Sequence, residues 1–125
     1  MAKKRVLIVD DEVGFTRLVR LSLEGTGRYE VREENDGRQA LASALEFRPD
    51  LIFLDVVMPE VDGGDVAAQL RQSGPLTGVP IVFLTAIVSQ REAAAGQEIG
   101  GYPFLAKPVA LDALARCIEE HTSAG

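Results

Sequence analysis

Short apolar runs that end in charged or hydroxyl side chains are the feature that most constrains how this chain can fold. The runs alternate with longer amphipathic stretches, and this alternation predicts repeated strand–helix units. Five strands are expected over residues 5–9, 29–32, 51–54, 81–84 and 104–106. The first, third and fourth are continuously apolar, which is typical of strands buried on both faces of a parallel sheet.

Amphipathic segments follow the apolar runs, and each predicts a helix. The expected helices span residues 14–24, 37–47, 64–72, 89–98 and 111–121. Four apolar side chains of the first helix are expected in the core: Leu18, Val19, Leu21 and Leu23. The second and fifth strands have the character of edge strands, which favours the order 2-1-3-4-5. The sequence therefore predicts an α/β fold, a flavodoxin-like doubly wound sheet of five parallel strands flanked by five helices.

Length and composition predict one domain over residues 1–125, with its core between about 5 and 121. The net charge of -6 and the lack of a basic stripe argue against direct binding of nucleic acid. The single cysteine, Cys117, allows no intrachain disulfide and fits a reducing compartment. No run reaches membrane-spanning length and no signal-peptide pattern is present, so we expect a cytoplasmic protein with no membrane contact.

Polar side chains follow four of the strands at the point where each strand ends. Asp10 and Asp11 follow the first strand, Asp55 the third, Thr85 the fourth and Lys107 the fifth. Parallel strands bring their carboxyl ends to one edge of the sheet, where we expect these groups to meet. Three carboxylates in a partly buried site repel one another unless some bind protons or a hard cation lies among them. Oxygen ligands favour Mg²⁺, with Mn²⁺ as the alternative.

The expected cluster suits phosphoryl transfer to a carboxylate. Asp55 would be the nucleophile and would form an acyl phosphate. The cation, the ammonium of Lys107 and the hydroxyl of Thr85 would offset charge on the phosphoryl oxygens. Each residue taken alone also has a structural explanation as a helix cap, a turn or a surface group. Their coincidence at several strand ends favours the functional interpretation.

As a set, these motifs resemble the receiver domains of response regulators in two-component signalling. The matching segments are VLIVDDE at 6–12, DVVMP at 55–59, DG at 62–63, TA at 85–86 and FLAKP at 104–108. They occur in the order and spacing of that family, and the resemblance covers essentially the whole chain. It also implies that the peptide between Lys107 and Pro108 is cis.

The resemblance implies a role for each residue of the cluster. Asp55 would be the phosphoacceptor, and Asp10 and Asp11 the acidic pair at a Mg²⁺ site. The backbone carbonyl of Val57 would be a further protein ligand of the ion. Lys107 would contact the phosphoryl group. The phosphodonor partner would be a sensor histidine kinase.

The same resemblance implies how the signal leaves the domain. Thr85 would be drawn toward the phosphoryl group, coupled to the aromatic residue of the fifth strand, here Phe104. The fourth helix, fifth strand and fifth helix would form the output face for a downstream protein or effector domain, or for a homodimer that forms on phosphorylation. Val57 and Ile87 occupy the two positions that tune hydrolysis in this family. Both are aliphatic, which predicts slow self-dephosphorylation.

Three alternatives stay open on the sequence. A haloacid-dehalogenase-like phosphatase also uses Asp, Thr and Lys, but it needs an acid where Val57 stands. A flavin or nucleotide module would need glycine or hydroxyl residues in the first loop, where Asp10 and Asp11 would repel phosphate. A receiver-like interaction module would never be phosphorylated. We expect a signalling phosphoacceptor, with no enzyme activity beyond its own phosphorylation and slow dephosphorylation, and we expect His121 to be a surface residue.

Overall fold

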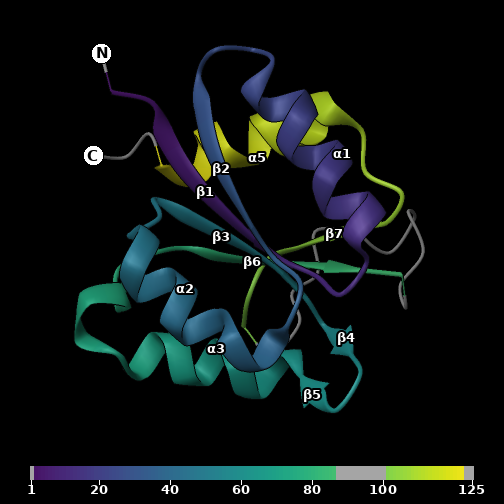
Figure 1. Cartoon of the computed structure of the whole chain (residues 1–125). Coiled ribbons are helices and arrows are strands. Elements are labelled where there is room, and N and C mark those ends of the chain that lie inside the picture. Colours follow the sequence, from purple (N-terminus) through teal and green to yellow (C-terminus); the bar gives the residue numbers. More distant parts are fainter. Residues whose placement is uncertain (1, 87–100, 123–125) are drawn as a thin grey trace.

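A five-stranded parallel sheet with helices on both faces forms the framework of the protein (Figure 1). The computed structural model describes residues 2–86 and 101–122. The strands are β1 (Lys4–Val9), β2 (Tyr29–Glu34), β3 (Leu51–Asp55), β6 (Ile81–Thr85) and β7 (Phe104–Ala106). Their order is β2-β1-β3-β6-β7 and all neighbours are parallel. The predicted flavodoxin-like order is therefore confirmed.

Helices cover the two faces of the sheet in pairs, α1 and α5 above it and α2 and α3 below it in Figure 1. They are α1 (Val13–Glu24), α2 (Ala40–Phe47), α3 (Gly63–Gln72) and α5 (Leu111–Thr122), with short 3₁₀ turns at Gly37–Gln39 and Gly74–Leu76. The predicted helix at 89–98 lies outside the described residues. Within the described residues, no helix has the length and apolar character needed to cross a membrane.

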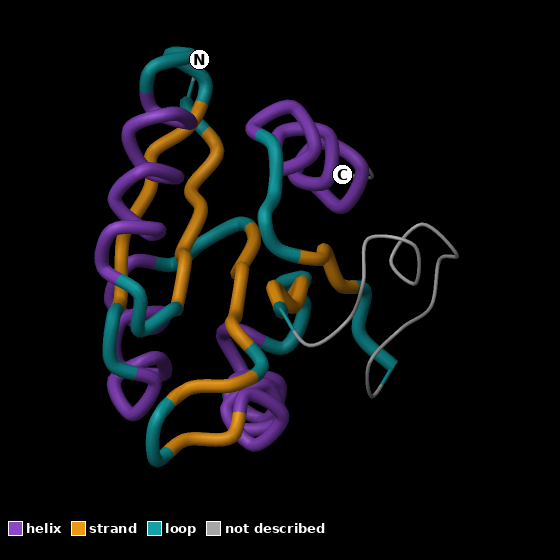
Figure 2. The backbone as a smooth tube through the Cα atoms, turned by 90° about the vertical axis from the view of Figure 1, so that its right-hand side faces the viewer, coloured by secondary structure: helices purple, strands orange, loops and turns teal. Residues whose placement is uncertain are grey.

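A small antiparallel hairpin follows β3 and was not predicted. It pairs β4 (Val57–Met58) with β5 (Val61–Asp62). Figure 2 views the protein from the side on which this hairpin lies. Asp62 then caps α3, because its side chain accepts a hydrogen bond from the Gly64 N–H at 2.7 Å. The hairpin and the cap together fix how the chain leaves β3 and enters α3.

The core has two layers because successive residues of a strand face opposite sides of the sheet. Ile8 of β1 packs on the side of α1 and α5, whereas its neighbour Leu7 packs on the side of α2 and α3. All residues of β3 and β6 are buried, as their continuous apolar sequences predict. The sheet is thus rigidly enclosed, and the ends of its strands are held at fixed positions relative to one another.

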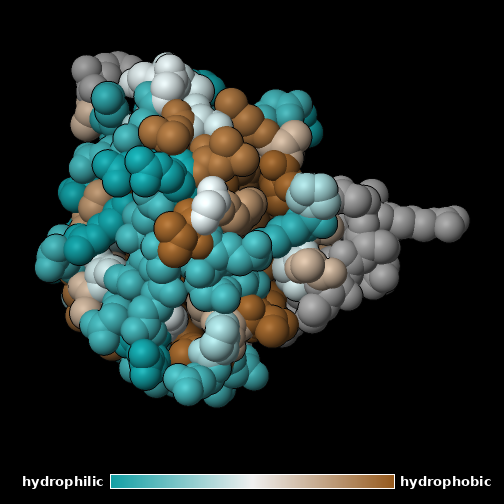
Figure 3. All heavy atoms as spheres, turned by 45° about the vertical axis from the view of Figure 1, so that its right-hand side comes forward, coloured by the Kyte–Doolittle hydropathy of each residue, from teal (hydrophilic) through white to brown (hydrophobic). Residues whose placement is uncertain are grey.

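The orientation of α1 differs from the sequence prediction. Leu18 and Leu21 are 64% and 61% exposed, so their predicted place in the core is wrong. The buried side of the helix instead carries Thr16, Val19 and Leu23. Thr16 can occupy this buried position because its hydroxyl is hydrogen-bonded. Figure 3 shows apolar side chains gathered in the upper half of one face of the molecule, above a mostly hydrophilic lower half.

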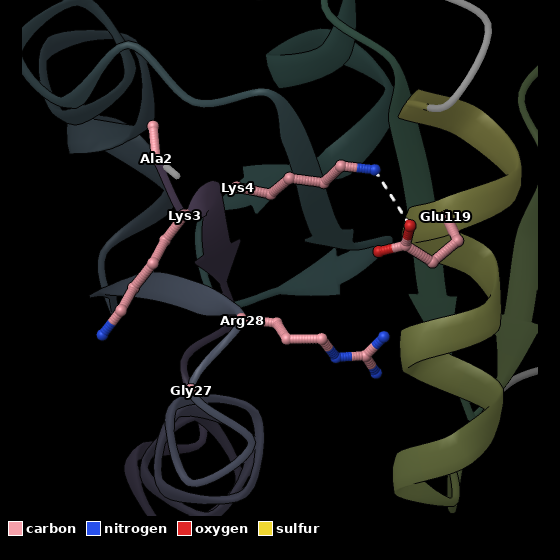
Figure 4. A pocket seen from close by; sticks show the side chains of 6 residues that line it. All are labelled: Ala2, Lys3, Lys4, Gly27, Arg28 and Glu119. Carbon is pink, nitrogen blue, oxygen red and sulfur yellow. Dashed lines mark hydrogen bonds and ion pairs between the residues drawn. The ribbon is translucent and has the colours of Figure 1, made fainter.

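The C-terminal half of α5 is fastened to the starts of β1 and β2 by a polar cluster (Figure 4). The Lys4 ammonium donates to Glu119 Oε1 at 3.0 Å and to Thr122 Oγ1 at 2.8 Å. The Tyr29 hydroxyl donates to the other oxygen of Glu119 at 2.7 Å. In Figure 4 the Lys4 side chain extends toward Glu119 on α5, whereas Lys3 points away from it. These bonds fix α5 at the edge of the sheet where β1 and β2 begin.

Candidate functional site

Asp10, Asp11 and Asp55 meet at the edge of the sheet where β1 and β3 end. One carboxylate oxygen of each lies within 4.8 Å of the others. The pairing of Val9 with Leu54 in the neighbouring strands brings Asp10 beside Asp55. Asp10 is fully buried and Asp55 is 6% exposed, whereas Asp11 lies at the surface. The predicted acidic cluster is therefore present, with two acids inside the protein and one open to solvent.

Lys107 lies within this cluster. Its Nζ atom is 2.6 Å from Asp10 Oδ2, 3.0 Å from Glu12 Oε1 and 3.7 Å from Asp55 Oδ2. Its side chain is 12% exposed, and the ammonium also lies 4.6 Å from the centre of the Phe15 ring. One positive charge thus faces several carboxylates, and the site as a whole stays negative.

The surroundings of Asp55 raise its pKa to about 6. Burial is the main cause, and the charge of Asp10 acts in the same direction. The ammonium of Lys107 and the hydrogen bond from the Val57 N–H to Asp55 Oδ1, at 3.2 Å, oppose the rise. Burial alone would lower the pKa of Lys107, but the neighbouring carboxylates raise it above its ordinary value. Asp55 is therefore destabilised as a carboxylate, while the lysine is stabilised as a cation.

The donor set fits a hard divalent cation. Asp10 Oδ2 is buried, and the Lys107 ammonium at 2.6 Å is its charged neighbour. Carboxylate oxygens from three residues are the ligands that Mg²⁺ prefers, and the exposed side at Asp11 leaves room for water or a phosphoryl oxygen. Val57 is the first residue of β4, two positions after Asp55, and it is 58% exposed. The role of its carbonyl as a ligand stays a prediction.

Thr85 and Phe104 occupy the neighbouring strands on the other side of β3. Thr85 is the last residue of β6 and is fully buried. Its carbonyl accepts a hydrogen bond from the Lys107 N–H at 2.9 Å, so the two predicted site residues are joined through the backbone. Phe104 is buried in β7 and pairs with Phe83. Ile87 lies outside the described residues.

The peptide between Lys107 and Pro108 is cis, as the resemblance implies.

Three further residues of the site were not predicted from the sequence as site residues. Glu12 and Phe15 contact Lys107, and Gly63 lies against β3. A Cβ atom at position 63 would lie 2.5 Å from the Asp55 carbonyl oxygen. The sequence signal for Gly63 was its place beside Asp62 in the DG motif, but the close backbone approach is visible only in three dimensions.

Comparison with known proteins agrees with this geometry. The model of the response regulator receiver domain matches residues 6–119, and the chain belongs to that family. The response regulator MprA of Mycolicibacterium vanbaalenii is 43% identical over 110 residues, covering 88% of this chain and 46% of the relative. The alkaline phosphatase synthesis transcriptional regulatory protein PhoP of Bacillus subtilis is 40% identical over 105 residues, covering 84% of this chain and 42% of the relative. The chain thus spans less than half the length of these relatives.

Solved structures with the same fold include chains of similar length. The chemotaxis protein CheY4 of Vibrio cholerae has a TM-score of 0.81 and 33% identity, with 95% of this chain and 98% of that chain covered. A putative response regulator from Chloroflexus aurantiacus has a TM-score of 0.82 and 32% identity, with 98% and 99% covered. These structures therefore share the overall fold of this chain.

Proposed function

We propose that this domain accepts a phosphoryl group on Asp55 from a sensor histidine kinase, with Mg²⁺ bound at the acidic cluster. The observation that carries the proposal is the meeting of Asp10, Asp11 and Asp55 around one point, with Lys107 within ion-pair distance of the two buried acids. Asp10, Asp11, Asp55 and the backbone carbonyl of Val57 would hold the ion. When bound, Mg²⁺ would supply positive charge beside the phosphoryl oxygens.

The transfer itself needs a nucleophile and a leaving group in line. An oxygen of ionised Asp55 would form a bond to phosphorus while the bond from phosphorus to the histidine nitrogen of the donor breaks. The electron pair of that bond stays on the imidazole nitrogen. Lys107 would shift from its carboxylate partners toward the phosphoryl oxygens, and the Thr85 hydroxyl would donate to one of them. Burial raises the pKa of Asp55 to about 6, and the positive charge of Lys107 opposes that rise and favours the ionised nucleophile.

We further propose that the donor kinase docks on the exposed side of α1. Val13, the first residue of α1, is 59% exposed, and Leu18 and Leu21, which are 64% and 61% exposed, lie on the side of the helix away from its buried residues. The first of these is two residues after Asp11, so an apolar surface begins beside the acidic cluster. A donor must approach Asp55 from outside, and burying these side chains would supply the attraction that holds it there.

The output of the domain is part of the same proposal. Phosphorylation adds negative charge and acceptor oxygens at Asp55, which would favour one of two conformations of the face that includes β7 and α5. That face would control a downstream protein, an attached effector domain or a homodimer. The relative from Bacillus subtilis is named as a transcriptional regulator, which supports control of an effector. We place the reaction in the cytoplasm and propose no turnover of small substrates.

Acetyl phosphate gives the direct test. The purified chain is incubated with acetyl phosphate and Mg²⁺, and its intact mass is measured. We expect a gain of one phosphoryl group that needs the metal and is lost in Asp55→Asn. Asp65→Asn, which changes an exposed acid of α3, is the matched control and should keep the gain. An unmodified native chain, or a gain that persists in Asp55→Asn, would refute the proposal. Release of many phosphates per chain would instead support the phosphatase alternative.

A further inference from the structure

We propose that Asn35 is a positioning residue of the cation site and sets its affinity by holding the backbone of Asp10. This inference rests on the proposed Mg²⁺ site. The Asn35 side-chain amide donates to the Asp10 carbonyl oxygen at 2.7 Å and to Thr16 Oγ1 at 2.9 Å. Both of its N–H groups are therefore used. Asn35 follows β2, so it ties the end of that strand to the turn that carries two of the three acids.

A partly buried network of hydrogen bonds and one ion pair holds Asn35 in this position. The Thr16 hydroxyl, which is fully buried, donates in turn to Glu33 Oε1 at 2.8 Å. The other oxygen of Glu33 lies 3.6 Å from Arg20 Nη1 on α1. The network thus joins the first turn of α1, the end of β2 and the end of β1. Networks in which each buried polar group has a partner hold their members in one arrangement.

The other contacts of the turn at residues 10–12 hold groups other than the Asp10 carbonyl. The Asp10 N–H donates to the Glu34 carbonyl at 3.0 Å, and Glu12 Oε1 lies 3.0 Å from Lys107 Nζ. Glu12, the N-cap residue of α1, makes no side-chain capping hydrogen bond. The Asp10 carboxylate is oriented by a hydrogen bond from the Glu12 N–H to Oδ1 at 2.9 Å. The Asp11 carboxylate is exposed, and within the part of the chain that the structure describes it has no hydrogen bond or ion pair of its own.

The direction of the Asp11 side chain therefore depends on its backbone. The peptide that joins Asp10 to Asp11 is planar, so fixing the Asp10 carbonyl fixes the plane from which Asp11 departs. Asn35 is the side chain that holds this carbonyl. Without it, mutual repulsion would drive Asp11 away from the two buried acids, and a cation would have to bring it back. Substitution of residues that hold metal ligands in position, without touching the metal, typically weakens metal affinity by about 10- to 100-fold.

Isothermal titration of the metal-free chain with MgCl₂ tests this role. The variant Asn35→Leu has nearly the same shape but no donor, and we expect its dissociation constant for Mg²⁺ to rise about tenfold or more. Thr16→Val removes the hydroxyl that holds Asn35 and should shift the constant in the same direction, which gives a second variant if the first does not fold. Thr26→Val is the matched control. It removes a hydroxyl bonded to the Leu23 carbonyl at 2.7 Å, at the opposite end of the same helix.

A second readout separates positioning from loss of structure. The Mg²⁺ concentration that gives half-maximal phosphorylation by acetyl phosphate should rise in Asn35→Leu, while the rate at saturating Mg²⁺ stays near the native one. The inference is overturned if Asn35→Leu binds Mg²⁺ within twofold of the native chain, or if Thr26→Val weakens binding as much. A native chain that takes up no Mg²⁺ would refute the proposed function itself, and this inference with it.

Discussion

Removal of the Asp55 charge should stabilise the metal-free protein at neutral pH. Burial and the charge of Asp10 raise the pKa of Asp55 from 3.8 to about 6. One pKa unit corresponds to about 1.4 kcal/mol, so ionised Asp55 weakens the native state by about 3 kcal/mol above pH 7. An asparagine side chain has nearly the same shape without the charge, although its buried amide still loses hydration. We therefore expect Asp55→Asn to raise the free energy of unfolding by about 1–3 kcal/mol.

The pH dependence of this gain has a definite sign. As the pH falls through 6, native Asp55 binds a proton before the unfolded chain does, because the pKa is raised only in the native state. The destabilisation of the native state by the Asp55 charge then disappears, and little of it is left below pH 4. The difference in the free energy of unfolding between Asp55→Asn and the native chain should be largest at pH 7.5 and should shrink steadily toward pH 4.

Urea denaturation with EDTA at a series of pH values measures this difference. The exposed carboxylate of Asp65 lies in the first turn of α3, where a negative charge is favourable. Asp65→Asn should therefore lower stability by less than about 1 kcal/mol, the opposite sign. Saturating Mg²⁺ should stabilise the native chain and have little effect on Asp55→Asn, which removes one ligand. The reasoning would be refuted by an Asp55→Asn variant that is no more stable than the native chain at pH 7.5, or by a gain that does not change with pH.

Three further outcomes follow from the geometry. Gly63→Ala should lower the free energy of unfolding by about 2 kcal/mol or more in urea denaturation, because its Cβ would meet backbone at 2.5 Å; Gly74→Ala, with no atom within 4 Å, should change it by less than about 0.5 kcal/mol. The paired change Leu18→Ser and Leu21→Ser should slow phosphotransfer from a kinase that phosphorylates the native chain by about tenfold, with acetyl phosphate labelling unchanged; equal rates from the kinase would argue against docking on α1. Val57→Asn should shorten the acyl-phosphate lifetime, followed by intact mass, by up to about tenfold, because it can orient a water molecule; a native chain that loses phosphate as fast would contradict the predicted slow hydrolysis.

The strand ends could be predicted from sequence because they follow from a simple periodic rule. Continuous apolar runs identified β1, β3 and β6, and parallel pairing then required that Asp10 and Asp55 be neighbours. The order of the strands followed from the same reasoning. The bounds differed by one or two residues, as at β2, which extends to Glu34.

The side chains that support the site could not be predicted in this way. The sequence favoured Leu18 and Leu21 as core residues, because leucine is usually buried and threonine is not. The structure buries Thr16 instead, since Glu33 and Asn35 provide hydrogen bonds from β2, a strand separate in sequence. Side-chain networks of this kind depend on distances between elements, and no local pattern reports them.

The site combines a rigid part and an adjustable part. Two acids are placed by adjacent buried strands, so the distance between Asp10 and Asp55 is set by the spacing of the sheet itself. The third, Asp11, lies on an uncapped turn whose backbone is held by the side chain of Asn35. Changes in that turn should therefore alter how much Mg²⁺ is needed, whereas the reactivity of Asp55 once the ion is bound depends on the sheet and on Lys107. A receiver domain built in this way can change its metal requirement through one residue after β2 without rebuilding the phosphorylation site.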